Sequence, residues 1–130
     1  MTSPPLVLHV DDDASIREVV RLMLEGLGGM QVQSVDGGPA AVELVSRTRP
    51  DVVLLDVMMP GMDGPQTLTR LREVEGCAEL PVIFLTAKVM RGEMRLLEGL
   101  GAAKIIQKPF RARELLDAIA GVLAPAQGNR

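Results

Sequence analysis

The sequence predicts an α/β fold, in which a single doubly wound sheet of five parallel strands is covered by five helices. Three observations predict it. Short apolar runs alternate with longer amphipathic segments along the 130 residues. The runs are nearly continuous in apolar residues, which is typical of parallel strands buried on both faces. Polar residues directly follow several runs, as expected where parallel strands end at one functional edge.

The first part of the chain is predicted to form two strands with a helix between them. Residues 6–10 are short, apolar and followed by three aspartates, which indicates a buried strand. Residues 15–27 carry apolar side chains at intervals of three and four, so they form an amphipathic helix that Gly28 and Gly29 end. Residues 31–35 are a weaker second strand.

The middle of the chain continues the alternation. Residues 39–48 are predicted to be a helix with alanine, leucine and valine side chains facing inward, and Pro50 ends it. Residues 51–55 form the third strand, because an aspartate is followed there by an unbroken aliphatic run. Residues 65–74 follow as a helix, and Pro65 suits its first position.

The last part of the chain supplies the remaining elements. Residues 81–85 form the apolar fourth strand, and residues 93–100 form a short helix that Gly101 ends. Residues 103–107 are a weak fifth strand, and residues 113–123 are the last helix. Since crossovers between parallel strands are right-handed, the helices must divide between the two faces of the sheet.

The length allows one domain of common size. We expect a folded domain over residues 5–124, short flexible termini at residues 1–4 and 125–130, and no output domain.

The composition excludes several classes of function. The net charge is −3, with 14 basic and 17 acidic residues, so there is no basic excess for nucleic acid. The absence of Trp and Tyr gives little support for stacking on bases or sugars. No apolar run approaches the length of a membrane span. A single cysteine, Cys77, cannot form an internal disulfide, which favours a reducing compartment and hence the cytoplasm.

Five polar residues fall at or just after predicted strand ends, and we expect them to meet at one edge of the sheet: Asp11, Asp12, Asp56, Thr86 and Lys108. Carboxylates brought this close repel one another unless a cation is bound between them. A donor set of oxygen atoms alone favours Mg²⁺, and Mn²⁺ or Ca²⁺ can substitute.

The same residues suit phosphoryl chemistry. Lys108 offers a compact positive charge and Thr86 a hydroxyl donor, so together with a cation they can cradle a phosphoryl group. Asp56 is then the nucleophile, which forms an aspartyl phosphate and is also a ligand of the cation.

Four motifs give the chain a resemblance to a known family. They are VDDD at residues 10–13, LLDVMMPGMDG at 54–64, FLTA at 84–87 and KPF at 108–110. The chain resembles the receiver domain of two-component response regulators, and in particular the single-domain chemotaxis regulators, over residues 5–124. The resemblance implies a flavodoxin-like sheet with strand order 2-1-3-4-5.

The resemblance also implies a role for each site residue. Asp56 accepts a phosphoryl group from a sensor histidine kinase or a histidine phosphotransfer protein. Asp11 and Asp12 hold Mg²⁺ together with Asp56 and the backbone carbonyl of Met58. Lys108 contacts the phosphoryl group through a position fixed by a cis bond to Pro109, and Thr86 moves toward the modified aspartate.

Two features concern the switch and the lifetime of the phosphate. Ile105 stands where family members usually carry Tyr or Phe, so the aromatic half of the switch is missing; alternatively, Ile105 only packs inside. Met58 and Lys88 lie two residues after Asp56 and Thr86, and the resemblance implies that they tune dephosphorylation. A side chain of Lys88 that is merely solvated is an equal alternative.

Two other residues have competing interpretations. Ile16 is either a core residue or part of an apolar patch that docks the phosphodonor. His9 lies in the middle of the first strand and is interpreted as a tolerated strand residue rather than a metal ligand or phosphodonor.

The sequence therefore favours a signalling switch that is phosphorylated on Asp56 and binds an as yet unknown output protein, without contacting nucleic acid directly and without membrane insertion. A phosphorelay intermediate or a receiver fragment of a larger regulator is the main alternative. A phosphatase of the haloacid-dehalogenase type is less favoured, because no late pair of acids follows Thr86. A receiver that has lost phosphorylation is also less favoured, because all five site residues are present.

Overall fold

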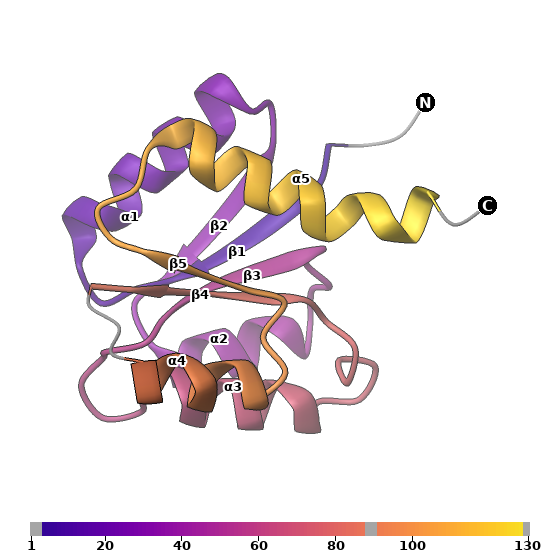
Figure 1. The fold of residues 1–130 in the computed structure, drawn as a ribbon. Helices are drawn as coiled ribbons and strands as arrows, with labels where there is room; N and C mark the ends of the chain where they lie inside the picture. The colour runs from indigo at the N-terminus through magenta and orange to yellow at the C-terminus, as the bar shows by residue number, and fades with distance from the viewer. Residues whose placement is uncertain (1–3, 88–90, 129–130) are drawn as a thin grey trace.

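A computed structural model describes residues 4–87 and 91–128 as a five-stranded parallel sheet between two layers of helices (Figure 1). The strands are β1 (Leu6–Val10), β2 (Gln31–Val35), β3 (Val52–Asp56), β4 (Val82–Thr86) and β5 (Lys104–Gln107). Their order across the sheet is β2-β1-β3-β4-β5, and every neighbouring pair is parallel. The predicted fold class and strand order are thus confirmed.

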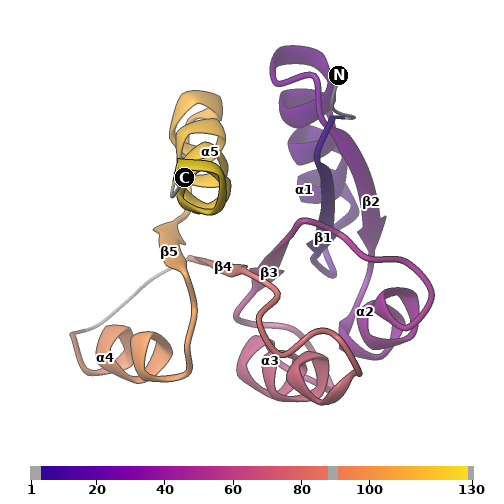
Figure 2. The same ribbon diagram turned by 90° about the vertical axis from the view of Figure 1, so that its right-hand side faces the viewer.

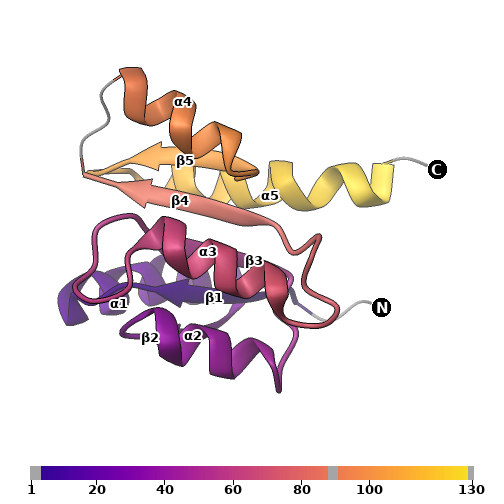
Figure 3. The ribbon, with the colours of Figure 1, turned by 90° about the horizontal axis from the view of Figure 1, so that it is seen from below.

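The helices divide between the two faces of the sheet, as right-handed crossovers require (Figures 2 and 3). One face is covered by α1 (Ala14–Arg21), its π-helical continuation η1 (Leu22–Leu27) and α5 (Ala112–Gly128). The other face is covered by α2 (Gly38–Val45), α3 (Gly64–Glu73) and α4 (Arg91–Gly99).

Each face has its own hydrophobic core. Beneath α1 and α5, buried residues of the central strands such as Leu54 and Leu85 pack with Val20 and Ile119. On the other face, the alternate residues of the same strands pack with helix residues such as Leu71. All five residues of β3 and all five of β4 are buried, which is the physical reason for their unbroken apolar runs.

Several helix ends differ from the prediction. The helix predicted over residues 15–27 changes to π-helical hydrogen bonding at Leu22, although Gly29, at φ +66°, ends it as expected. The helix α2 stops at Val45 rather than at residue 48, because the backbone N–H groups of Ser46 and Arg47 donate to carbonyls three residues back instead of four. The helix α5 continues to Gly128, past the predicted end at Leu123.

The extension of α5 runs through a part of the chain where a frayed tail was expected. Ala124 and Ala126 are strong helix formers, and Pro125 removes only one backbone N–H donor, so the helical backbone continues. None of the helices in residues 4–87 and 91–128 is long and apolar enough to cross a membrane.

The register of the sheet brings the predicted site residues to one edge. Val10 lies opposite Leu55, Asp56 opposite Leu85, and Thr86 opposite Gln107. The residues that end or directly follow β1, β3, β4 and β5 therefore lie side by side at the carboxyl ends of the strands.

Candidate functional site

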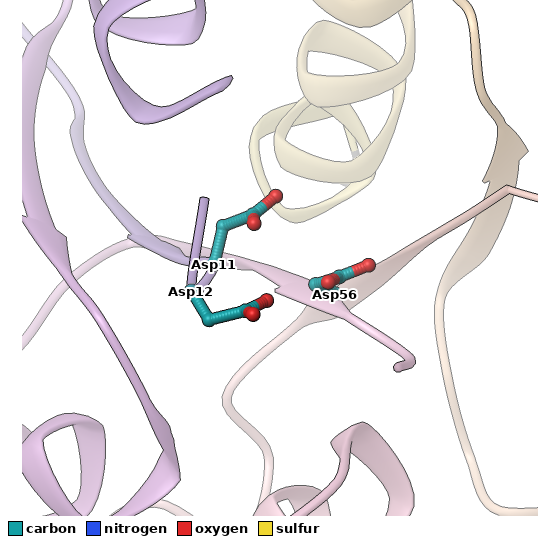
Figure 4. Close-up of side chains that lie close together, drawn as sticks. All are labelled: Asp11, Asp12 and Asp56. Atoms are coloured by element: carbon teal, nitrogen blue, oxygen red, sulfur yellow. The ribbon is translucent and has the colours of Figure 1, made fainter. Parts of the chain in front are cut away.

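Three carboxylates meet at this edge of the sheet (Figure 4). Asp11 follows β1 directly and is buried, Asp12 is exposed, and Asp56 is the buried last residue of β3. One carboxylate oxygen from each of the three lies within 4.8 Å of the others. The predicted convergence of these aspartates is therefore present in the structure.

The ammonium group of Lys108 bridges two of the carboxylates. Its Nζ lies 3.1 Å from Asp56 Oδ1 and 3.3 Å from Asp11 Oδ2. Lys108 follows β5, and its backbone N–H donates to the carbonyl of Thr86 at 2.7 Å. The bond between Lys108 and Pro109 is cis, as the resemblance implies.

Asp11 is held from several directions. Its backbone N–H donates to the carbonyl of Val35, and its own carbonyl accepts from the guanidinium of Arg17 at 2.7 Å. Its Oδ1 accepts from the backbone N–H of Asp13 at 2.9 Å. Asp13 in turn caps α1 by accepting from Ser15 and Ile16, so the start of the helix and the position of Asp11 are linked.

The turn after Asp56 depends on two glycines. Gly61 has φ +80°, which other residues rarely adopt. Gly64 begins α3 so close to the strand that a Cβ atom there would lie 2.6 Å from the backbone oxygen of Asp56. A capping box between Asp63 and Gln66 fixes the same helix start. The turn therefore holds α3 against the backbone of the phosphoacceptor candidate.

The charges perturb one another. Burial raises the pKa of Asp56; the hydrogen bond from Lys108 opposes this and the charges of Asp11 and Asp12 add to it, so the pKa lies above its ordinary value. Burial also raises the pKa of Asp11, but contacts with His9, the Asp13 amide and Lys108 outweigh it and the pKa is lowered. Burial lowers the pKa of Lys108, but Asp56 and Asp11 outweigh it and the pKa is raised.

These directions assign different characters to the two buried carboxylates. Asp11 is the better stabilised anion. Asp56 is the more basic one, because the fold alone stabilises its charge less.

The donor set fits a hard divalent cation. Among the described residues, Asp11, Asp12 and Asp56 form the one acidic group close enough to share an ion. Its ligands are oxygen atoms, and the exposed side of Asp12 leaves room for water, which Mg²⁺ typically retains. A cation there would also relieve the repulsion among the three carboxylates.

The switch candidates lie around the same edge. Thr86 is buried at the end of β4 and lines a pocket of about 180 Å³ between the turn after β3 and α4, together with Val57, Met58, Asp63, Pro65, Glu93, Leu96 and Leu97. The side chain of Met58 is 73% exposed. Ile105 is partly buried and packs against the core beneath α2, α3 and α4. Lys88 lies outside the described residues.

Ile16 lies beside a second, more apolar pocket. This pocket of about 500 Å³ opens between α1 and the loop before α5, and it is lined by Ile16, Val19, Val20, Met23, Ala87, Lys108, Pro109 and Phe110. Ile16 is therefore only partly buried, and it lies in a surface that reaches Lys108.

Two residues near the site were missed or undervalued by sequence reasoning. Arg17 belongs to an amphipathic helix and looks like a solvated charge, but it binds the Asp11 carbonyl. His9 is a strand residue, as interpreted, but its Nε2 also lies 3.7 Å from Asp11 Oδ2. The one available signal was the spacing of two residues, which places His9 and Asp11 on the same face of β1.

Comparison with known proteins gives a consistent result. The family model for the response regulator receiver domain matches residues 7–120. The response regulator MprA of Mycobacterium leprae is 38% identical over 117 residues, which cover 90% of this chain and 50% of that protein. The chain spans about half the length of the first curated relatives that it matches.

Solved structures agree with the sequence matches. The chemotaxis protein CheY4 of Vibrio cholerae has a TM-score of 0.87 and 30% identity, covering 92% of this chain and 99% of that one. The receiver domain of the sensor histidine kinase PA1611 from Pseudomonas aeruginosa has a TM-score of 0.85 and 29% identity, covering 93% and 98%. That structure contains a magnesium ion coordinated in its active-site cleft.

Proposed function

Because the chain belongs to the response regulator receiver domain family of two-component signalling, we propose that Asp56 accepts a phosphoryl group from a histidine kinase or a histidine phosphotransfer protein. The observation that carries this proposal is the geometry around Asp56: a basic carboxylate beside two further carboxylates and one bridging ammonium. The protein is then a signalling switch that binds a partner protein when modified.

In the proposed transfer, one oxygen of Asp56 attacks phosphorus. The bond between phosphorus and the donor nitrogen breaks, and the imidazole of the donor keeps the electron pair. The ammonium of Lys108 lies 3.1 Å from Asp56 Oδ1, so it can stabilise the negative charge on the phosphoryl oxygens during the transfer. A divalent cation held by Asp11, Asp12, Asp56 and the carbonyl of Met58 would neutralise phosphoryl charge; Mg²⁺ fits best, and Mn²⁺ or Ca²⁺ could replace it.

The same chemistry implies two unassisted reactions. A small phosphodonor can replace the protein donor, because the site itself positions and stabilises the phosphoryl group. Attack of water on the aspartyl phosphate then regenerates Asp56. We therefore include self-phosphorylation and autodephosphorylation in the proposal, without classing the protein as an enzyme.

We assign phosphodonor docking to the pocket beside Ile16. It is apolar, it lies between α1 and the loop before α5, and Lys108 is part of its lining. A helix of the donor seated there would bring its histidine to the edge that holds Asp56. The apolar lining supplies contact area, and the polar residues of the site supply the orientation.

The readout step is assigned to Thr86 and its surroundings. A phosphoryl group on Asp56 would draw the Thr86 hydroxyl toward it and change the pocket that Thr86 shares with Leu96 and Leu97 of α4. Ile105 has neither a ring nor a hydroxyl, so we expect the signal to pass through α4 and its preceding loop. The output partner is proposed to be a protein rather than nucleic acid, given a net charge of −3. We also propose a cytoplasmic location.

A phosphorelay intermediate, or the receiver part of a longer regulator, is the second candidate. It is favoured by the likeness to a receiver domain of a sensor kinase and by the greater length of the curated relatives. In both candidate functions Asp56 is phosphorylated by the same chemistry. They differ only in the protein or domain that receives the signal or the phosphoryl group next.

The test is incubation with Mg²⁺ and acetyl phosphate, followed by measurement of intact mass. We expect one phosphate adduct in the wild-type protein and none in Asp56→Asn. An adduct that survives in Asp56→Asn but requires Asp11 would contradict the proposal and favour a phosphatase of the haloacid-dehalogenase type. Failure of the wild-type protein to form an adduct would favour a receiver that has lost phosphorylation.

A further inference from the structure

The imidazole of His9 is a buried polar group without a use in the function proposed above. His9 is fully buried in β1, and among the described residues neither ring nitrogen has a hydrogen-bond partner. On the same face of the sheet, its neighbours Val7 on β1 and Leu54 on β3 are apolar, and the exposed Ser34 on β2 lies opposite it on the other side. An aliphatic side chain would suit such a place, because an unpaired buried polar group destabilises the folded state.

The imidazole is directed at one particular oxygen. Nε2 of His9 lies 3.7 Å from Asp11 Oδ2, just beyond hydrogen-bond length. The same oxygen lies 3.3 Å from the Lys108 ammonium, whereas Asp11 Oδ1 accepts from the backbone N–H of Asp13. Lys108 and His9 therefore approach the same oxygen atom, and within the described part of the chain only Lys108 is bonded to it.

We propose that His9 is a positioning residue for Asp11: its Nε2–H donates to Asp11 Oδ2 when Lys108 leaves that oxygen for the phosphoryl group. The inference rests on the proposed function, in which Lys108 turns toward the modified Asp56. Without a replacement, Asp11 would then lose the only side-chain donor that its Oδ2 has among the described residues. A shift of less than 1 Å brings the ring to an ordinary length of about 2.9 Å.

Because the backbone of Asp11 is held in place, a small movement of the side chains is enough for His9 to reach Asp11 Oδ2. Arg17 and Val35 hold the main chain of Asp11, and the Asp13 amide holds Oδ1. Only the Oδ2 side of the carboxylate changes its partner. Donors behind a metal-binding carboxylate keep it oriented, and their loss typically weakens metal binding about tenfold or more.

A double-mutant cycle on Mg²⁺ binding tests the exchange of partners. The cycle combines His9→Leu, which removes the ring donors, with Lys108→Met, which removes the ammonium. Mg²⁺ affinity is measured by calorimetry on the unphosphorylated proteins, because the chain has no Trp to report binding by fluorescence. His9→Leu should change the affinity less than about threefold when Lys108 is present, and weaken it about tenfold in Lys108→Met.

Two further variants separate positioning from packing. His9→Gln keeps an N–H donor at a similar reach, so Lys108→Met with His9→Gln should bind Mg²⁺ nearly as well as Lys108→Met alone. Val7→Ala alters the same strand and face without removing a donor, and it should leave the affinity unchanged. Equal effects of His9→Leu in both backgrounds, or a His9→Gln variant that behaves like His9→Leu, would overturn the proposal.

A measurement on the wild-type protein avoids the variants altogether. His9 is the only histidine, so the ring signals of isotope-labelled protein need no assignment. On addition of Mg²⁺ and acetyl phosphate, the proton on Nε2 should shift downfield and exchange more slowly. A ring that carries its proton on Nδ1, or signals that phosphorylation leaves unchanged, would contradict the proposal. An absent phosphate adduct in the same sample would instead show that the proposed function itself fails.

Discussion

The two ends of the sheet use charge in opposite ways. At the amino ends of the strands, the guanidinium groups of Arg49 and Arg72 each donate to two or more backbone carbonyls. At the carboxyl ends, three carboxylates face the ammonium of Lys108, which is the one cationic side chain paired with them among residues 4–87 and 91–128. The positive charges at the amino ends hold loops together, whereas the negative charges at the carboxyl ends are only partly neutralised.

At the amino end, each of the two guanidinium groups connects separate parts of the backbone. Arg49 donates to the carbonyls of Val45 and Glu75, and so ties the end of α2 to the connection between α3 and β4. Arg72 of α3 donates to the carbonyls of Cys77 and Leu80 in the same connection, and to Gly101 at 3.4 Å. Three loops are thus held together by two side chains.

The carboxyl end contrasts with this pairing. The raised pKa of Asp56 indicates that its ionised form is poorly stabilised by the fold alone. That shortage of positive charge is what a cation and a phosphoryl group can exploit. Residues at the amino edge of the sheet thus contribute mainly to stability, and residues at the carboxyl edge mainly to reactivity. Mutations at the two edges should therefore have separable effects.

The largest effect on stability is expected at the amino end. Arg72→Met should lower the free energy of unfolding by about 2–3 kcal/mol, because partly buried carbonyls lose a charged donor. Denaturant unfolding measures the loss. The exposed Arg70 of the same helix offers a matched control, and Arg70→Met should change little. If Arg72→Met also abolished phosphorylation by acetyl phosphate, the two ends would not be separable.

The next effect concerns the cation. Mg²⁺ at about ten times its dissociation constant should raise the free energy of unfolding by about 1.4 kcal/mol, because it binds only the folded site. Asp12→Asn should remove this gain, while Glu25→Gln, an exposed acid on η1, should retain it. Thermal unfolding with Mg²⁺ and with EDTA measures the difference. An equal gain in Asp12→Asn would mean that the cation does not bind at the three carboxylates.

A smaller effect distinguishes the two buried carboxylates in EDTA. Since the pKa of Asp56 is raised, its ionisation reduces stability as the pH rises from the pKa of the unfolded state through the raised pKa of the folded state, and the loss is complete above it. Asp56→Asn should therefore be more stable than wild type at neutral pH, with no gain at low pH where Asp56 is protonated. Asp11 has a lowered pKa, so Asp11→Asn should be less stable at neutral pH, and the loss should vanish at low pH.

These paired curves of stability against pH would test the assignment directly. Stabilisation by both substitutions would mean that simple repulsion governs the site and that Lys108 and the Asp13 amide do not favour Asp11. Destabilisation by both substitutions would mean that the Lys108 ammonium stabilises the ionised form of Asp56 as well as that of Asp11. Either result would remove the argument that Asp56 is the more basic carboxylate.

Sequence reasoning predicted the carboxyl end far better than the amino end. Asp11, Asp56 and Lys108 follow apolar strands, and parallel pairing forces strand ends together, so the sequence determines their meeting. Arg49 and Arg72 follow no such rule. They bind backbone carbonyls, which every residue carries, so their partners have no sequence signature. Arg17 was missed for the same reason.

The end of α5 and the contact of His9 with Asp11 illustrate two other limits. The last helix was predicted to end at Leu123, but the helical backbone continues to Gly128. The spacing of His9 and Asp11 predicts a shared face of β1, but the distance of 3.7 Å depends on side-chain packing. Patterns fix which residues are neighbours, whereas packing fixes which atoms touch.

The smallest effect on stability is expected where the effect on function is large. Met58 is 73% exposed beside Asp56, so Met58→Asn combined with Lys88→Ala should change the free energy of unfolding by less than about 0.5 kcal/mol. The lifetime of the phosphate should nevertheless change, because the resemblance to receiver domains implies that both positions tune dephosphorylation. Decay of the adduct mass measures it. Glu79→Ala, at an exposed position of the amino end, is the control and should leave the lifetime unchanged. Equal lifetimes in the wild type and in the Met58→Asn, Lys88→Ala double variant would mean that other residues set the rate of dephosphorylation.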